Sequence, residues 1–108
     1  MEIQKDSESK KLRILIVEDN FANRFLLQKM LSPYGDVFVA VNGNEAIEAF
    51  QVSVEQKESY DLICLDILMP EKDGQSVLKE IRDIEKLDGI LPGRGVKIVM
   101  ITGLTSPK

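Results

Sequence analysis

The segment from Tyr60 to Pro70, Tyr-Asp-Leu-Ile-Cys-Leu-Asp-Ile-Leu-Met-Pro, constrains the fold more than any other part of the chain. Asp66 alone interrupts the apolar run at 62–67, which is typical of a strand buried on both faces of a parallel sheet. Pro70 cannot donate a hydrogen bond to a sheet and favours an extended or turn conformation at Met69, so we expect the strand to end near Asp66. Because a buried lone carboxylate is costly, Asp66 is predicted to lie at the carboxyl end of the strand, where open α/β sheets bind ligands.

Segments with helical spacing separate this strand from three further apolar runs of strand length. Those further strands are predicted at 12–17, 37–41 and 96–101. Helices are predicted at 21–31 after a cap at Asn20, from a cap at Asn44 to Val54, and at 76–87. The first helix carries apolar residues at Phe21, Phe25, Leu26, Met30 and Leu31. Strands that alternate with helices favour parallel βαβ units, so the predicted fold is α/β, a doubly wound parallel sheet with strand order 2-1-3-4.

Composition restricts the classes of function. The 108 residues fit one domain, with residues 1–11 as a flexible polar tail and 12–108 as the folded unit. A formal net charge of -4 argues against a nucleic-acid surface, and no apolar run is long enough for a membrane span or follows a signal-peptide pattern. We therefore expect a cytoplasmic protein, with its one cysteine, Cys64, buried in the core. Because histidine is absent, the chain has no imidazole base and is a poor zinc candidate.

Polar residues follow the strands at places that the topology should bring together. Glu18 and Asp19 come directly after the first strand, Asp66 ends the third, and Thr102 follows the fourth. In a sheet with order 2-1-3-4 the crevice lies between strands 1 and 3, so all four residues should meet there. Three carboxylates in one crevice repel each other unless a cation neutralises them, and Mg²⁺ is the preferred partner of such oxygen ligands. The alternative for each residue taken alone is a solvated strand end.

At these residues the chain resembles a response-regulator receiver domain, the phosphoacceptor module of two-component signalling. The resemblance covers roughly 12–102 and is carried by Glu18-Asp19, the Asp66 strand, the Met69-Pro70 and Asp73-Gly74 loop, and Thr102. It implies a flavodoxin-like fold in which Asp66 accepts the phosphoryl group.

The resemblance also implies the roles of the other site residues. Asp19 would bind Mg²⁺ directly, Glu18 through water, and Leu68 through its backbone carbonyl, and Asp66 would be a metal ligand as well as the phosphoacceptor. The Thr102 hydroxyl would bond the phosphoryl group. With no histidine in the chain, the phosphoryl donor must be another molecule. The family implies a histidine kinase or phosphotransfer protein that docks on the first helix. The chain would then be a phosphoryl acceptor and not an enzyme.

The sequence departs from the family after Thr102. The family continues with a fourth helix, a fifth strand and a fifth helix, and carries a lysine at the end of the fifth strand. Lys108 comes too early to be that lysine. Without the fifth strand, the strand at 96–101 presents an open apolar edge, so we expect the chain either to dimerise or swap elements through this edge, or to be part of a longer protein.

One other function is a real alternative to phosphoacceptance, whereas the sequence disfavours a phosphatase and excludes a dinucleotide site. The alternative is a receiver-derived interaction module that works without phosphorylation, which the missing lysine favours. A haloacid-dehalogenase-type phosphatase needs a second aspartate two residues after its nucleophile, where this chain has Leu68. A dinucleotide site needs a glycine-rich turn where this chain has Glu18-Asp19-Asn20.

Overall fold

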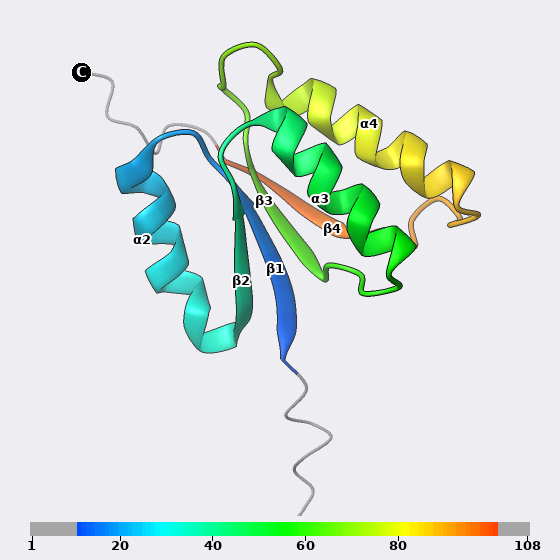
Figure 1. The fold of residues 1–108 in the computed structure, drawn as a ribbon, viewed down its shortest axis with the longest axis horizontal. Helices are drawn as coiled ribbons and strands as arrows, with labels where there is room; N and C mark the ends of the chain where they lie inside the picture. Colours follow the sequence, from blue (N-terminus) through cyan, green and yellow to red (C-terminus); the bar gives the residue numbers. More distant parts are fainter. Residues whose placement is uncertain (1–10, 102–108) are drawn as a thin grey trace, which may run out of the picture.

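The structure is a computed structural model that describes residues 11–101 as a parallel sheet with helices on both faces (Figure 1). The elements are β1 (Leu12–Val17), α2 (Phe21–Leu31), a short 3₁₀ helix (Ser32–Tyr34), β2 (Gly35–Ala40), α3 (Gly43–Glu55), β3 (Leu62–Asp66), α4 (Gly74–Leu87) and β4 (Lys97–Ile101). The predictions made for the tail at 1–10 and for Thr102 lie outside the described residues.

The sheet has the predicted topology. Its four strands are parallel and follow the order β2-β1-β3-β4, so the order reverses between β1 and β3. In register, Ile16 lies opposite Cys64, and Asp66 opposite Ile101. The strand at 62–66 ends at Asp66 as predicted, because Ile67 leaves the ladder after one last hydrogen bond from its N–H to the Ile101 carbonyl, at 3.0 Å. The carboxyl ends of β1 and β3 therefore lie side by side at the crevice of the fold.

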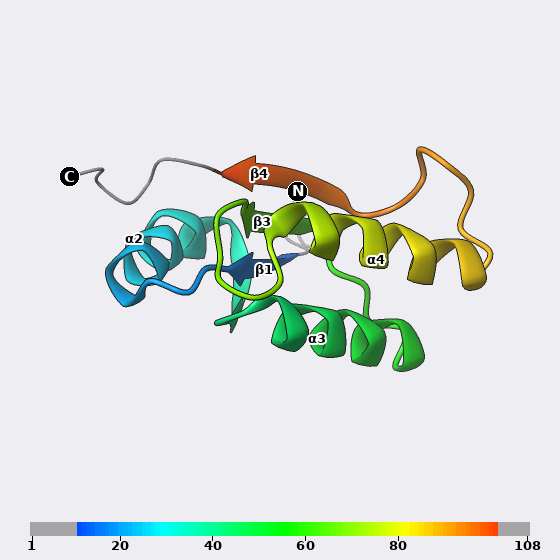
Figure 2. The ribbon, with the colours of Figure 1, turned by 90° about the horizontal axis from the view of Figure 1, so that it is seen from above.

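The helices divide the core between the two faces of the sheet. Figures 1 and 2 show α3 and α4 packed side by side on one face and α2 alone on the other. The main core lies under α3 and α4; among its members are Leu15, Val17, Phe50, Ile63, Leu65, Val77 and Ile81. Ile14 and Ile16 are fully buried, and Leu27 of α2 and Cys64 are nearly so. Cys64 is thus a core residue, as its place in an apolar strand predicted.

The first helix begins where the sequence indicated, at a cap formed by Asn20. The Asn20 side chain accepts a hydrogen bond from the Asn23 N–H at 2.9 Å, which satisfies one free donor of the first turn. The prediction that Asn44 caps the next helix is wrong. Asn42 is the cap and accepts from the Glu45 N–H at 2.8 Å. Glu45 in turn accepts from the Val41 N–H at 2.9 Å, and this reciprocal pair fixes the start of α3 two residues earlier than Asn44 allows.

Three further boundaries differ from the predictions. The last helix begins at Gly74, two residues early, because Asp73 caps it by accepting from the Ser76 N–H at 2.9 Å. The second strand occupies 35–40 instead of 37–41, and Gly35 pairs with Leu12 so closely that a side chain there would collide with the Leu12 backbone. The last strand begins one residue late, at Lys97.

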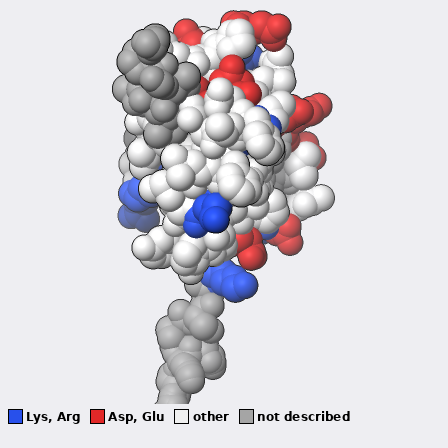
Figure 3. Space-filling view, turned by 90° about the vertical axis from the view of Figure 1, so that its left-hand side faces the viewer, with Lys and Arg blue, Asp and Glu red and all other residues white. Residues whose placement is uncertain are grey.

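The apolar residues predicted for the first helix lie mostly on its exposed side. Phe21, Phe25, Leu26 and Met30 are each about half to two-thirds exposed, whereas Leu27 is the residue of α2 that is buried. Figure 3 views the molecule from the side of α2 and shows a mainly uncharged surface with a few Lys or Arg side chains, and acidic side chains toward the top and one side. The apolar face of α2 therefore has no cover from the described part of the chain.

The strand β4 is an edge of the sheet. Among residues 11–101 it pairs with β3 alone, and Val99 is 49% exposed. This agrees with the open edge expected from the sequence. No helix within the described ranges has the length and apolar character needed to cross a bilayer.

Candidate functional site

Three carboxylates meet at the carboxyl ends of β1 and β3. Glu18 and Asp19 directly follow β1, and Asp66 is the last residue of β3. One carboxylate oxygen from each of the three residues lies within 4.8 Å of the others. The topology thus brings together three of the four residues expected in the crevice, and Thr102 lies outside the described residues.

The three carboxylates differ in exposure. Glu18 is 1% exposed, Asp66 is half-buried and Asp19 is exposed. The Asn20 N–H donates to Glu18 Oε2 at 3.2 Å, and the Leu68 N–H donates to Asp66 Oδ1 at 3.1 Å. Both backbone groups therefore hold a carboxylate oxygen in place, and a hydrogen bond also links the Glu18 and Asp66 carboxyls to each other.

Burial and mutual repulsion make the ionised forms of these carboxylates unfavourable. Burial raises the pKa of Glu18 to about 7, and the charges of Asp66 and Asp19 add to the rise, while the Asn20 N–H opposes it. Burial also raises the pKa of Asp66, although the hydrogen bond from the Leu68 N–H lowers it in part. A positive charge placed among them would remove this repulsion and favour full ionisation.

The loop after β3 holds Asp66 against the start of α4. The Gly74 N–H donates to the Ile67 carbonyl at 3.0 Å, and a side chain at Gly74 would come within 2.5 Å of the Asp66 backbone oxygen. Only glycine allows this close approach. Met69 is buried, which anchors the loop, whereas the side chain of Leu68 is exposed. The role of the Leu68 carbonyl as a metal ligand stays a prediction.

Arg24 belongs to the site and was missed from the sequence. Its Nη1 donates to the backbone carbonyls of Glu18, at 3.1 Å, and Asp19, at 3.3 Å. The signal lay in its spacing, because an arginine in the first turn of a helix that follows the acidic pair can reach back to that pair. The pattern of apolar residues in α2 does not by itself point to Arg24.

The donor set suits a hard divalent cation. All three side chains offer carboxylate oxygens, which Mg²⁺ and Ca²⁺ prefer, and within residues 11–101 no nitrogen or sulfur donor joins the cluster. Exposed Asp19 leaves the cluster open to solvent, as Mg²⁺ requires because it keeps several of its waters. The residues present therefore fit such an ion.

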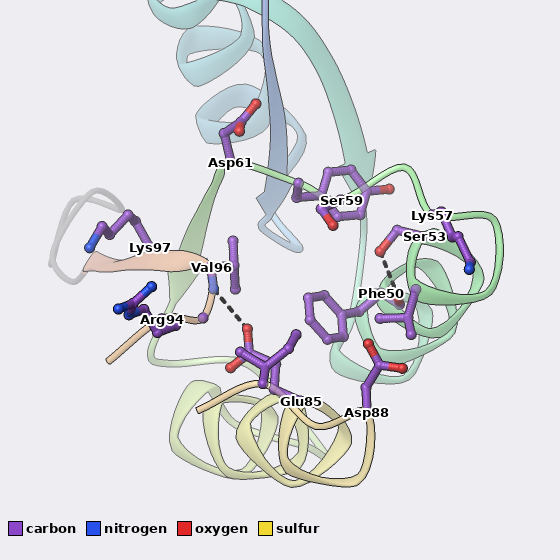
Figure 4. Close-up of a pocket in the computed structure, with 14 residues that line it drawn as sticks. Phe50, Ser53, Lys57, Ser59, Asp61, Glu85, Asp88, Arg94, Val96 and Lys97 are labelled. Carbon is purple, nitrogen blue, oxygen red and sulfur yellow. Dashed lines mark hydrogen bonds between the residues drawn. The ribbon is translucent and has the colours of Figure 1, made fainter. Parts of the chain in front are cut away.

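A separate cavity of about 660 Å³ lies at the opposite end of the sheet (Figure 4). It is lined by the ends of α3 and α4 and by residues that precede β3 and begin β4, among them Phe50, Asp61 and Asp88. Glu85 reaches across one side and accepts from the Val96 N–H at 2.7 Å. None of the three clustered carboxylates lines this cavity, so it is distinct from the site between β1 and β3.

The comparisons with known proteins agree with this geometry. A family model described as "Response regulator receiver domain" matches residues 14–108. The chain is 41% identical over 97 residues to hybrid signal transduction histidine kinase B of Dictyostelium discoideum. The aligned segment covers 87% of this chain and 5% of that protein. More generally, the chain spans only 5% to 9% of the length of the first curated relatives it matches.

Two solved structures are also similar. The receiver domain of the histidine kinase CKI1 from Arabidopsis thaliana, complexed with Mg²⁺ and BeF₃⁻, has a TM-score of 0.76 at 29% identity, covering 95% of this chain and 72% of that one. A co-crystal structure from Saccharomyces cerevisiae contains the histidine phosphotransfer protein Ypd1 and the receiver domain of its response regulator Ssk1. It matches with a TM-score of 0.64 at 28% identity, covering 86% of this chain and 63% of that one.

Fold, carboxylate cluster and comparisons lead to one identification. The match to the family model covers most of the chain, and the sheet order and the acidic residues at its switch point are those that the sequence predicted. The chain belongs to the response regulator receiver domain family of two-component signalling.

Proposed function

We propose that the chain accepts a phosphoryl group on Asp66 in a Mg²⁺-dependent reaction with a partner protein. The observation that carries this proposal is the meeting of Glu18, Asp19 and Asp66 within 4.8 Å at the switch point of the sheet. Asp66 is the nucleophile in this proposal because it ends a central strand, is half-buried, and has one oxygen oriented by the Leu68 N–H. Its carboxyl also shares a hydrogen bond with the Glu18 carboxyl, which a bound cation would replace. Glu18, Asp19, Asp66 and the Leu68 carbonyl are the metal ligands in this proposal.

The transfer forms one bond and breaks another. A carboxylate oxygen of Asp66 bonds to phosphorus while the P–N bond of a donor phosphohistidine breaks, and the donor imidazole keeps the electron pair and takes up a proton. Mg²⁺ bound at the cluster would supply positive charge that offsets the charge of the carboxylates and of the phosphoryl oxygens. The Thr102 hydroxyl donates to a phosphoryl oxygen in this proposal, following the family resemblance. The product is an acyl phosphate, which water hydrolyses, so the chain carries a signal and turns over no substrate of its own.

The exposed apolar face of α2 is the proposed docking surface for the phosphoryl donor. Phe21 is 71% exposed and stacks on Phe25 with ring centroids 6.2 Å apart, next to exposed Leu26 and Met30. This face begins immediately after the acidic pair, so a partner bound there would hold its histidine near Asp66. A histidine kinase or a histidine phosphotransfer protein meets this requirement, and the yeast neighbour was crystallised together with a protein of the second kind.

A second function, an interaction module that works without phosphorylation, is favoured by a different observation. Both the face of α2 and the edge of β4 expose apolar groups that the described residues leave uncovered. Such surfaces bind partners whether or not Asp66 is modified. We propose this function as the alternative, with self-association through the β4 edge as its simplest form.

Intact-mass spectrometry after incubation with acetyl phosphate separates the two functions. The wild-type chain is expected to gain one phosphoryl group with Mg²⁺ present and none with EDTA, and Asp66→Asn is expected to gain none under either condition. Asp61→Asn is a matched control, because Asp61 is an exposed carboxylate at the other end of β3. A folded wild-type protein that binds Mg²⁺ but gains no mass would contradict phosphoacceptance and favour the interaction module.

A further inference from the structure

Arg24 links the docking helix to the acidic loop through its guanidinium group. The side chain folds back from the first turn of α2, and a single nitrogen, Nη1, donates to the carbonyls of both Glu18 and Asp19. The side chains of the same two residues are two of the three carboxylates in the cluster. A hydrogen bond from a charged donor is stronger than one between neutral groups, so this contact is well suited to hold the loop.

The backbones of Glu18 and Asp19 are held by different hydrogen bonds. The backbone of Glu18 is tied to β2 by its own N–H, which donates to Ala40 at 3.1 Å, whereas Asp19 is exposed and receives no side-chain hydrogen bond other than that from Arg24 among those the structure records for residues 11–101. Arg24 thus provides the hydrogen bond that holds the Asp19 carbonyl in the described part of the chain.

Within residues 11–101, Arg24 forms no ion pair with an acidic side chain. The salt bridges within the described residues involve Lys11, Arg13, Lys72, Lys79 and Arg82, and not Arg24. Its guanidinium also lies over the Phe21 ring, 5.5 Å from the centroid, and the residue is half-buried. Stacking on an aromatic face restricts the plane of the guanidinium and so helps to aim its N–H groups.

We propose that Arg24 is a positioning residue of the metal site. It fixes the backbone of Glu18 and Asp19 so that their carboxylates face Asp66. This inference rests on the proposed function, because it supposes that the cluster binds Mg²⁺. Arg24 touches neither the metal nor the phosphoryl group in this account and acts through the backbone of the ligands.

Isothermal titration calorimetry with Mg²⁺ alone tests the inference on the full chain. Arg24→Met keeps the length of the side chain but removes its charge and donors, and we expect it to weaken Mg²⁺ binding by about 10- to 100-fold, the usual effect of losing a partner that orients a metal ligand. Lys29→Met is the matched control, because Lys29 is also a cation on α2 and lies over an aromatic ring, Phe25, at 5.7 Å. The control should change the dissociation constant for Mg²⁺ by less than about twofold, since Lys29 is exposed near the far end of α2 and salt screens its charge from the carboxylates.

Arg24→Lys separates positioning from simple stability. A lysine keeps the charge but lacks the planar group that stacks on Phe21 and reaches both carbonyls, so it should recover only part of the lost affinity. Thermal unfolding in EDTA gives the stability of each variant without metal. If Arg24→Met does not fold, the comparison of Arg24→Lys with wild type decides, and equal affinities there would overturn the inference.

The outcomes distinguish this inference from the function on which it rests. Wild-type protein and Arg24→Met that bind Mg²⁺ within about twofold of each other would overturn the positioning role and leave the metal site intact. Wild-type protein that shows no Mg²⁺ binding would overturn both. A loss of affinity in Arg24→Met that is absent in Lys29→Met, with both variants folded in EDTA, is the result that we expect.

Discussion

Glu18 shows how the position of one residue sets the chemistry of the site. It is almost fully buried beside Asp66, so its burial and the neighbouring charges raise its pKa to about 7. A buried carboxylate of this kind destabilises the protein when it is ionised and unpaired. The ionised carboxylates therefore have an unfavourable electrostatic free energy, which a bound cation would lower.

This cost predicts how the stability of the metal-free protein depends on pH. The pKa of Glu18 is about 7 in the folded state and about 4.5 in the unfolded state, and the pKa of Asp66 is also raised by folding. Between these values the folded protein binds more protons than the unfolded chain, so the free energy of unfolding should fall as the pH rises from about 4.5 to about 7.

Urea unfolding in EDTA measures this dependence. The difference between the unfolding midpoints of wild type at pH 5.5 and at pH 7.5 should be larger than the same difference in Glu18→Gln, which cannot titrate. Equal differences in the two proteins would mean that the Glu18 carboxyl does not titrate in this range on folding.

At the scale of elements, one buried carboxylate joins α4 to β4. Glu85 is 4% exposed and pairs with Arg82 at 2.7 Å. It also accepts from the Val96 N–H at 2.7 Å across the loop at 88–96 (Figure 4). Gly95 packs against the same carboxylate so closely that a side chain would collide with it. The loop is thus held at its far end by a contact that is distant from the carboxylate cluster.

Removing this contact should destabilise the fold. Glu85→Ala leaves the Val96 N–H and the Arg82 guanidinium without their partner, and we expect a loss of about 2–4 kcal/mol in the free energy of unfolding. Asp83→Ala, which removes an exposed i,i+4 pair with Lys79 on the same helix, should cost less than about 0.5 kcal/mol. Similar losses from the two variants in urea unfolding would contradict the role given to Glu85.

The elements that the sequence predicted well are those specified by local chemistry. The apolar run before Asp66 and the proline after it limit that strand from both sides, and the structure ends it at Asp66. The start of α3 was misplaced because Asn42 and Asn44 are both good caps by residue type. The start at Asn42 is fixed by Glu45, because its N–H donates to the Asn42 side chain and its carboxylate accepts a hydrogen bond from the Val41 N–H.

For the site, the sequence predicted only the residues whose meeting follows from the strand order. Strand ends that carry Glu18, Asp19 and Asp66 must meet once the strand order is known, and the structure places them together. Arg24 could not be found in this way, because its role depends on a side chain that folds back onto backbone carbonyls. The exposure of Phe21 and Phe25 was also unpredictable, since a helical pattern of apolar residues does not say which of them the sheet will cover.

At the scale of the whole molecule, the uncovered surfaces govern association. The face of α2 and the edge of β4 are both apolar and both free of cover from residues 11–101. An open strand edge pairs readily with another chain unless a charge interrupts it. The 108-residue chain is therefore expected to form dimers through β4.

Light scattering during gel filtration tests this association. The mass of the wild-type chain should rise toward that of a dimer with increasing concentration, and Val99→Lys should remain a monomer because it places a charge on the edge strand. Val52→Lys is the matched control, since Val52 is 45% exposed on α3 and lies away from β4. A wild-type protein that stays monomeric at high concentration, or an equal effect of both variants, would contradict the edge dimer.

The central claim is that Asp66 carries the phosphoryl group, and locating that group in the chain tests it most directly. Borohydride reduces an aspartyl phosphate to homoserine, so peptide mass spectrometry after treatment with acetyl phosphate, Mg²⁺ and borohydride identifies the modified residue. We predict homoserine at position 66 and unmodified aspartate at position 19. Homoserine at another carboxylate, with position 66 unchanged, would contradict the account.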